Sequence, residues 1–161
     1  MIAQEKLKEL LHYDPVTGIF TWLSQASNGI NIGHVAGRLN VRGCVEIGIC
    51  GIVHKAHRLA WLYMTGEWPK EHIDHINGVR NDNRWGNLRE ATRVINSQNR
   101  HKAQRNNITG FLGVSRSGKG FMARIKPDKK KQIYLGTFPT PLLAYKAYLD
   151  AKRKLHDGCT I

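Results

Sequence analysis

The chain has 161 residues, enough for one ordinary domain or two small ones, and its 25 Lys and Arg against 12 Asp and Glu give a formal net charge of +13. No apolar run is long enough to span a membrane and no signal-peptide core follows the N-terminus, so we expect a soluble, intracellular, cytoplasmic protein. The three cysteines are odd in number and form no CxxC pair, which argues against a disulfide framework and against a structural zinc site.

The positive charge is unevenly distributed along the chain. Residues 1–99 contain 11 basic and 9 acidic side chains, whereas residues 100–161 contain 14 basic and 3 acidic ones. A segment this basic is typical of proteins that bind a polyanion by releasing its counterions. The alternatives are a solvated surface that only aids solubility, or binding to an anionic membrane, which needs a basic amphipathic helix that the sequence lacks. We expect the C-terminal part to bind nucleic acid and no part to bind a membrane.

The N-terminal half is expected to be rich in strands. Residues 3–12 have the apolar spacing of a helix and stop before a strong turn signal at 14–18. Residues 19–56 are rich in glycine and β-branched side chains, which favours short strands joined by tight turns. Residues 56–65 have the apolar density of a buried helix, which Gly66 ends.

The middle of the chain predicts a strand, a loop, a second strand and a helix. The strands are expected at residues 73–76 and 87–91, with a turn and a polar loop between them. Thr92 is a suitable N-cap for a helix that runs over residues 93–101.

The last part is expected to form a separate small domain. Residues 100–109 are polar and basic and are interpreted as a linker. Apolar and polar side chains then alternate with period two over residues 110–138, with turn signals at 117–120 and 128–131, which predicts three antiparallel strands. Thr140-Pro141 opens a helix whose alanines would let it lie close to the sheet. The outer face of this sheet would carry Arg124, Lys126 and Tyr134.

The middle region holds the side chains that a single-metal phosphodiesterase needs. Its β-loop-β-helix order would bring Asp74 and His75 close to Asn96. Asp74 offers a carboxylate and Asn96 an amide oxygen to one divalent cation, Mg²⁺ or Mn²⁺, which would relieve charge on the phosphoryl group and the departing oxygen. His75, as a neutral imidazole, could take the proton from water. Asn87 could hold the loop or orient His75.

Four arginines in the first 99 residues are candidates for contacts to DNA phosphates. The guanidinium group is suited to charge-assisted hydrogen bonds with phosphate oxygens. Three of the four flank the predicted site and one begins the apolar helix. They are Arg80, Arg84, Arg89 and Arg58.

Residues 57–99 resemble the HNH (His-Asn-His) endonucleases of the homing and phage-borne kind, which have a ββα-metal fold. The matching stretches are His57-Arg58-Leu59, Asp74-His75-Ile76-Asn77-Gly78, Asn81-Asp82-Asn83, Asn87-Leu88-Arg89 and Ile95-Asn96. The resemblance implies that Asp74 and Asn96 are the metal ligands. It also implies that His75 is the general base and Asn87 a structural amide. Asn96 stands where the family name has a histidine, which weakens the expected metal affinity, although some relatives also use asparagine there.

The C-terminal part resembles the Apetala-type DNA-binding domain of the ethylene-response-factor class. The resemblance lies in Gly113-Val114, Ala123-Arg124-Ile125-Lys126, Tyr134-Leu135-Gly136-Thr137-Phe138 and Ala144-Tyr145. That family lays its three-stranded sheet into the DNA major groove. The residues expected to contact DNA are Arg116, Arg124, Lys126 and Tyr134, together with Lys119 in the first hairpin turn. Tyr134 stands where an indole is usual and Ser115 where an arginine is usual, so the sequence preference of the plant proteins does not transfer.

We therefore expect an α+β protein in three parts. Residues 1–99 would hold a β-rich N-terminal region that leads into a ββα-metal nuclease core at 57–99. Residues 100–109 would be the basic linker, and residues 110–161 the DNA-binding domain, a small three-stranded antiparallel sheet plus one helix.

The leading hypothesis is a metal-dependent endonuclease of the homing or phage type. It would cleave double-stranded DNA to 5′-phosphate and 3′-hydroxyl ends, in the host cytoplasm if a phage encodes it. One alternative is a non-catalytic, sequence-specific DNA-binding regulator that keeps a vestigial nuclease scaffold. Another is a nuclease directed at RNA or at a particular nucleic-acid structure. One site per chain cuts one strand, so monomer and homodimer both stay open.

Overall fold

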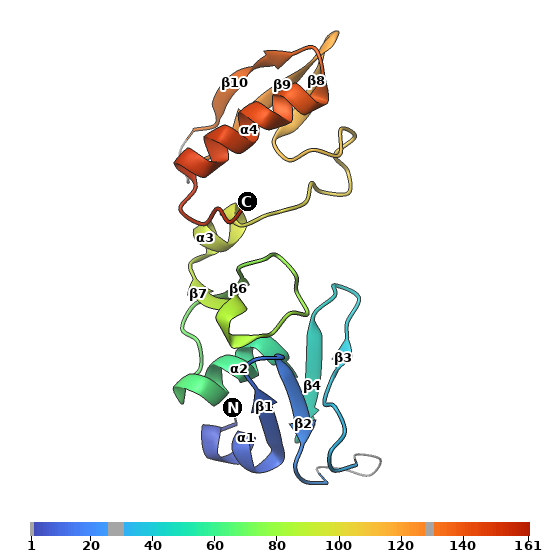
Figure 1. Ribbon diagram of the computed structural model, residues 1–161, viewed down its shortest axis with the longest axis vertical. Coiled ribbons are helices and arrows are strands. Elements are labelled where there is room, and N and C mark those ends of the chain that lie inside the picture. The colour runs from blue at the N-terminus through green and yellow to red at the C-terminus, as the bar shows by residue number, and fades with distance from the viewer. Residues whose placement is uncertain (1, 26–30, 128–130) are drawn as a thin grey trace. The chain divides into compact units, whose positions relative to one another are not determined.

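The computed structural model describes residues 2–25, 31–127 and 131–161 (Figure 1). The chain divides into two compact units, Met1–Glu90 and Ala91–Ile161, and each has its own hydrophobic core. No helix in the described part is long and apolar enough to cross a membrane. Residues 128–130, which belong to a predicted hairpin turn, lie outside the described residues.

The first unit begins with a helix and a hairpin. α1 (Gln4–Leu10) runs directly into β1 (Leu11–Asp14), which pairs antiparallel with β2 (Ile19–Trp22). We expected the helix to continue to residue 12, and this prediction was wrong. Leu11 and Tyr13 are buried while His12 is exposed, which is the two-residue period of a strand, and pairing with β2 satisfies that pattern.

A sheet, a helix and a second strand pair complete the first unit. β3 (Arg38–Leu39), β4 (Val45–Ile49) and β5 (Ile52–Lys55) form an antiparallel sheet in that order. α2 (Ala56–Thr65) follows β5 and ends as predicted at Gly66, which caps it in the left-handed conformation with φ 82°. β6 (His72–His75) pairs with β7 (Leu88–Ala91), and the short 3-10 helix η1 (Trp85–Asn87) immediately precedes β7.

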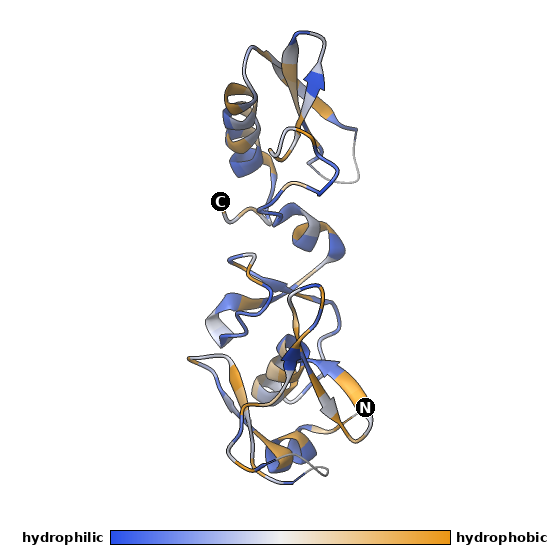
Figure 2. Ribbon diagram, turned by 90° about the vertical axis from the view of Figure 1, so that its right-hand side faces the viewer, coloured by the Kyte–Doolittle hydropathy of each residue, from blue (hydrophilic) through white to orange (hydrophobic). Residues whose placement is uncertain are grey.

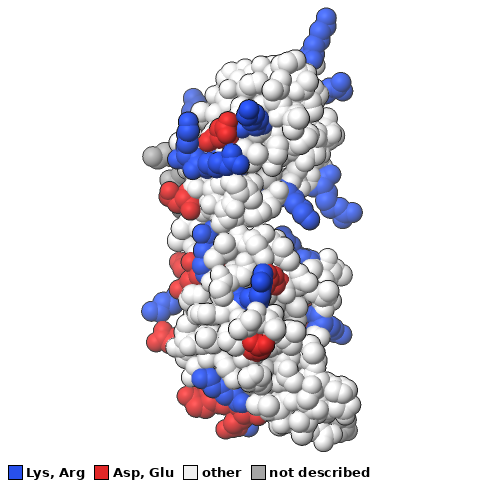
Figure 3. All heavy atoms as spheres, viewed as in Figure 1, with Lys and Arg blue, Asp and Glu red and all other residues white. Residues whose placement is uncertain are grey.

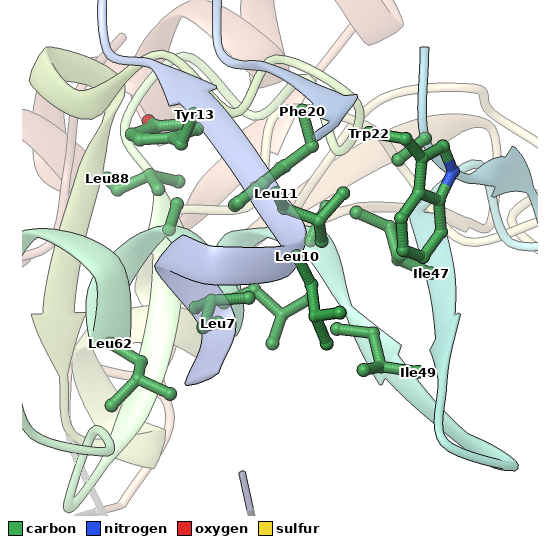
Figure 4. Close-up of a cluster of buried hydrophobic side chains, with 14 of the residues drawn as sticks. Leu7, Leu10, Leu11, Tyr13, Phe20, Trp22, Ile47, Ile49, Leu62 and Leu88 are labelled. Atoms are coloured by element: carbon green, nitrogen blue, oxygen red, sulfur yellow. The ribbon is translucent and has the colours of Figure 1, made fainter. Parts of the chain in front are cut away.

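The core of the first unit joins the N-terminal hairpin to the β6–β7 pair (Figure 4). The hairpin contributes Tyr13 and Phe20, β4 contributes Ile47, and the β6–β7 pair contributes Ile73 and Leu88. Full burial of one such side chain contributes about 1.5–3 kcal/mol. Because the same cluster holds all of these elements, the strands that carry the predicted motif are anchored by residues that precede the motif in sequence.

The second unit contains a short helix, a three-stranded sheet and a long helix. α3 (Arg93–Gln98) comes first, and the antiparallel sheet of β8 (Val114–Ser117), β9 (Gly120–Ile125) and β10 (Ile133–Phe138) has the order β10-β9-β8. α4 (Pro141–Leu155) begins as predicted, because the Thr140 side chain accepts a hydrogen bond from the Leu143 N–H (3.3 Å). Figure 2 shows that apolar and polar stretches alternate along α4.

The core of the second unit lies between the sheet and α4. Val114, Ala123 and Ile125 of the strands and Ala144 and Tyr148 of the helix are buried together. The expected alanine of the helix is therefore at the sheet contact, where a small side chain permits close approach.

The mixed α+β class with small antiparallel sheets is confirmed. The ββα-metal core and the division into a nuclease and a DNA-binding domain stay predictions. α3 ends at Gln98 rather than near residue 101, and the boundary between the two compact units lies ahead of α3. The predicted linker at residues 100–109 lies inside the second unit and has no helix or strand.

Candidate active site

Asp74 and His75 are both buried at the end of β6, with exposed fractions of 5% and 7%. Successive side chains of a strand point to opposite faces, and the two residues accordingly have different neighbours. Asp74 is paired with Arg89 of β7, whereas His75 contacts Asn83 and His57. A buried carboxylate and a buried imidazole are therefore adjacent in sequence, and each contacts its own partners.

The His75 ring contacts the amide of Asn83, a residue of a matching stretch to which the sequence assigned no role. The Nε2 atom of His75 lies 3.2 Å from Oδ1 of Asn83, which is 2% exposed. Because an amide oxygen only accepts hydrogen bonds, Nε2 carries the hydrogen and Nδ1 is the basic nitrogen of the neutral ring. The Asn83 Nδ2 group donates to the Asn81 carbonyl (3.4 Å), which supports this orientation of the amide.

Burial lowers the pKa of His75, mainly because the surrounding protein disfavours the charged ring. The hydrogen bond with Asn83 and the nearby carboxylates of Asp74 and Asp82 act in the opposite direction, and Arg80 adds to the lowering. The net shift keeps His75 neutral near pH 7, which is the state that a general base requires.

Asn87 ties together the two ends of the loop between β6 and β7. Its Oδ1 accepts a hydrogen bond from the Asn77 N–H (2.9 Å), and its Nδ2 donates to the Asp82 carbonyl (2.7 Å). The Asn87 carbonyl also accepts from the Ile76 N–H (2.9 Å). Of the two roles considered for this residue, these contacts favour holding the loop over orienting His75.

Arg89 makes an ion pair with Asp74. Its Nε and NH2 groups lie 3.0 and 2.9 Å from the same carboxylate oxygen, Oδ2. The carboxylate side chain is 6% exposed and the guanidinium side chain 29% exposed. Arg89 was expected to contact phosphate, but in the structure its guanidinium balances the charge of the predicted metal ligand.

The other three arginines of the first unit also have protein partners. Arg58 donates to the Pro69 carbonyl (3.5 Å) and lies over the Trp68 ring at 5.8 Å. Arg80 donates to the Arg42 carbonyl (3.2 Å). Arg84 pairs with Asp82 at 2.6 Å, and this pair lowers the pKa of Asp82 to about 2.

Asn96 lies on α3 and is half-buried, and its N–H donates to the Thr92 carbonyl at the start of that helix (3.0 Å). It belongs to the second unit, whereas Asp74 belongs to the first. That the two residues share one metal ion therefore stays a prediction.

The two predicted metal ligands, Asp74 and Asn96, offer oxygen atoms to a metal ion. Within residues 2–25, 31–127 and 131–161, no three His, Cys, Asp or Glu side chains group together as a metal site. The carboxylate of Asp74 and the amide of Asn96 fit a hard cation such as Mg²⁺, which keeps water or phosphate oxygens as its remaining ligands. The Arg89 pair shows that the Asp74 position already favours a positive charge.

His57 of α2 is a second buried imidazole against His75. The two rings meet edge to face, with centroids 5.0 Å apart and an angle of 88° between planes. Its Nδ1 atom is buried without a hydrogen-bond partner among the described residues. Burial is the main cause that lowers the pKa of His57 to about 3, and His75 adds to the effect. Sequence reasoning favoured a structural role for His57, and its neutral, buried state is consistent with that role.

The substitution His57→Leu is expected to flatten the pH dependence of stability. In the unfolded chain this histidine takes up a proton below about pH 6.5, whereas in the folded protein it does so only near pH 3. The stability that depends on neutral His57 is thus complete above pH 6.5 and is lost as the pH falls toward 3. Between pH 8 and pH 5 the wild type should lose about 2 kcal/mol more than the variant in urea unfolding. His72→Leu, the same change at an exposed histidine, serves as control; equal losses in wild type and His57→Leu would contradict the assignment.

The predicted DNA-binding residues of the second unit are exposed but do not all share one face. Arg124 and Tyr134 are directly paired across β9 and β10. Arg116 is two residues from buried Val114, so strand alternation puts it on the opposite face from Arg124. Lys119 lies in the β8–β9 turn and Lys126 follows β9. Lys and Arg outnumber acidic side chains over this unit in Figure 3.

A basic groove, with a volume of about 860 Å³, lies within the second unit. It is lined by α3, by the end of β9, by the segment between α3 and β8, and by Tyr148 and His156 of α4 and its C-terminal end; no Asp or Glu is among its lining residues. Its basic lining residues are Arg93, Arg100, Arg124, Lys126 and His156. Arg93 and Arg100 were not among the residues expected to bind DNA, because residue 93 was placed in the nuclease helix and residue 100 in the linker.

Comparison with known proteins supports the resemblance of the motif region to HNH endonucleases. Residues 54–98 match a family model described as HNH endonuclease, and the match begins near the end of β5 and ends with α3. No curated protein and no solved structure matches the chain. The Apetala-type resemblance of residues 110–161 has no such support and stays a prediction. Residues 54–98 of this chain are thus similar to the HNH endonuclease domain.

Proposed function

We propose that this protein is a metal-dependent endonuclease that hydrolyses phosphodiester bonds of double-stranded DNA. The observation that carries the proposal is the His75 ring: it is buried, its pKa is lowered, and its Nε2 is held by Asn83, so that Nδ1 is the basic nitrogen. An HNH domain at residues 54–98 supports nuclease chemistry at this position.

In the proposed mechanism the Nδ1 atom of His75 takes the proton from the attacking water. Asn83 keeps the ring in the tautomer that allows this, and Asn87 holds the loop that carries Asn83. Asp74 and Asn96 would hold one Mg²⁺ or Mn²⁺ ion. When bound, that ion would supply positive charge to the phosphoryl group and to the departing 3′-oxygen. The expected products are 5′-phosphate and 3′-hydroxyl ends.

The experiment is cleavage of supercoiled plasmid by the full chain with Mg²⁺, with Mn²⁺ and with EDTA. Nicked or linear plasmid in either metal, none in EDTA, and ends that DNA ligase reseals are the expected results. Strand-resolved mapping of the cuts would then separate nicking from double-strand cleavage and report on the homing type. Absence of cleavage in both metals would contradict the proposal.

One observation favours the alternative of a non-catalytic DNA-binding regulator. Oδ2 of Asp74 is already engaged by the guanidinium of Arg89. Tight, sequence-specific DNA binding without cleavage in either metal would support that alternative.

The DNA affinity is expected to depend on the basic groove of the second unit. Arg124→Gln and Arg100→Gln should each weaken binding to all duplex sequences alike and reduce the slope of log affinity against log salt by about 1. Lys146→Gln removes the same charge from an exposed position on α4 and should leave the slope unchanged. Fluorescence anisotropy in EDTA measures binding without cleavage. An equal loss of DNA affinity in all three variants would show that only the net charge matters and that the groove is not the binding surface.

A further inference from the structure

We propose that the β1–β2 hairpin is a positioning element of the His75 site, and that it acts through Asn83. This inference rests on the proposed function, because it concerns the same imidazole. The hairpin lies outside residues 54–98, the segment that matches the HNH family. The described contacts connect it to the active-site loop at three points.

Asn83 is the residue through which the hairpin reaches His75. Its side-chain Oδ1 lies 3.2 Å from His75 Nε2, while its backbone carbonyl accepts a hydrogen bond from the Tyr13 hydroxyl (2.6 Å). With 2% of its surface exposed, Asn83 is enclosed between these two partners. A shift of its backbone would therefore move the oxygen that orients the imidazole.

Tyr13 is a rigid donor. It is 1% exposed, and its ring packs against Phe20 at 4.7 Å and against Tyr63 at 5.6 Å between centroids. Burial raises the pKa of Tyr13, so the hydroxyl stays protonated and donates at every pH at which the protein is expected to work. The position of the Asn83 carbonyl is thus set by a side chain of the N-terminal core.

The turn of the hairpin lies directly against the same loop. The Trp85 N–H donates to the Pro15 carbonyl (2.9 Å). A Cβ atom added at Gly18 would come closer than 3.0 Å to backbone atoms of both Asn83 and Arg84. Gly18 also has φ +73°, a left-handed conformation that glycine adopts without strain. Only a glycine permits this turn to approach the loop so closely.

The functional consequence follows from how proton transfer depends on geometry. The hydrogen bond to Asn83 selects the Nε2–H tautomer of His75, and the hairpin holds Asn83 in place. A misplacement of about 1 Å in a reacting group can lower a rate on the order of 100-fold. The hairpin therefore acts as a positioning element, whereas His75 remains the residue that contacts the reacting water.

The test compares three single substitutions in the full chain. Tyr13→Phe removes one hydroxyl and should lower kcat about tenfold without changing DNA affinity. Gly18→Ala should lower kcat on the order of 100-fold. Gly51→Ala is the matched control, because Gly51 has nearly the same φ of +76° but no atom within 4 Å of an added Cβ. It reproduces the backbone strain of Gly18→Ala without the collision.

A second measurement does not depend on activity. In ¹⁵N-labelled, metal-free protein, the His75 ring should show one neutral tautomer with hydrogen on Nε2 in wild type and Gly51→Ala. Tyr13→Phe and Gly18→Ala should show a mixture of tautomers. If the wild type does not cleave DNA, the proposed function fails but this measurement still decides the positioning role. An unchanged tautomer and unchanged kcat in Tyr13→Phe, which is expected to fold even if Gly18→Ala does not, would overturn the inference.

Discussion

Replacing His75 with alanine is expected to lower the rate of DNA cleavage by about 10²–10⁴-fold while DNA affinity stays at the wild-type value. The reason is that the substitution removes the basic Nδ1 atom but none of the arginines and lysines proposed to contact phosphate. The rate should be measured under single-turnover conditions on supercoiled plasmid, and the affinity separately in EDTA. His72→Ala changes an exposed histidine of the same strand, β6, and should cleave like wild type.

Loss of activity in His75→Ala could also come from a disturbed fold, because His75 is buried. Thermal unfolding of the variant and rescue of its cleavage by added imidazole separate the two causes. Imidazole can enter the space left by the side chain and supply a base, but it cannot repair a misfolded loop. Cleavage by His75→Ala at the wild-type rate would remove this residue from the mechanism.

The sequence predicted the elements whose signals are local. The Gly66 stop of α2, the Thr92 cap of α3 and the Thr140 cap of α4 all lie where they were expected. Each of these signals depends on one residue and its immediate neighbours, so sequence alone carries it.

The parts that were not predicted depend on contacts between distant segments. Leu11 fits the helical spacing of Leu7 and Leu10, and it also begins the two-residue period that continues at Tyr13; pairing with β2 decides for the strand. Asn83 was one polar residue of a matching stretch, and its contacts with His75 and with Tyr13, 70 positions away in sequence, depend on the fold. Asn87 was given two possible roles, holding the loop or orienting His75, and its contacts favour the first.

The partner of Arg89 also depends on a contact between distant segments of the chain. Its sequence position beside the motif suggested a phosphate contact, because arginines near a nuclease site often bind phosphate. The β6–β7 pairing brings it against Asp74, a contact that the sequence did not predict. The Arg89 guanidinium thus contacts the carboxylate that is proposed to bind a metal ion. Removal of this guanidinium should therefore change how much a metal ion stabilises the protein.

Arg89→Gln is expected to lower the free energy of unfolding by about 3 kcal/mol in EDTA, and Mg²⁺ or Mn²⁺ is expected to restore much of that loss. The substitution takes away the guanidinium that balances the buried charge of Asp74, and breaking such a pair from one side is costly. A divalent cation at Asp74 would replace the missing charge. At a metal concentration of about 100 times the dissociation constant, binding to the folded state alone adds about 2.7 kcal/mol.

Comparison of Arg89→Gln with wild type and with Asp74→Asn makes the prediction specific. Wild type should gain less stability from metal than Arg89→Gln, because in wild type the metal must share or displace the guanidinium on Oδ2. Asp74→Asn lacks the carboxylate and should gain nothing from metal. Urea unfolding of all three proteins with and without Mn²⁺ measures these differences without any cleavage. Equal stabilisation of Asp74→Asn and wild type would place the metal elsewhere, and equal stabilisation of wild type and Arg89→Gln would show that Arg89 does not compete with the ion.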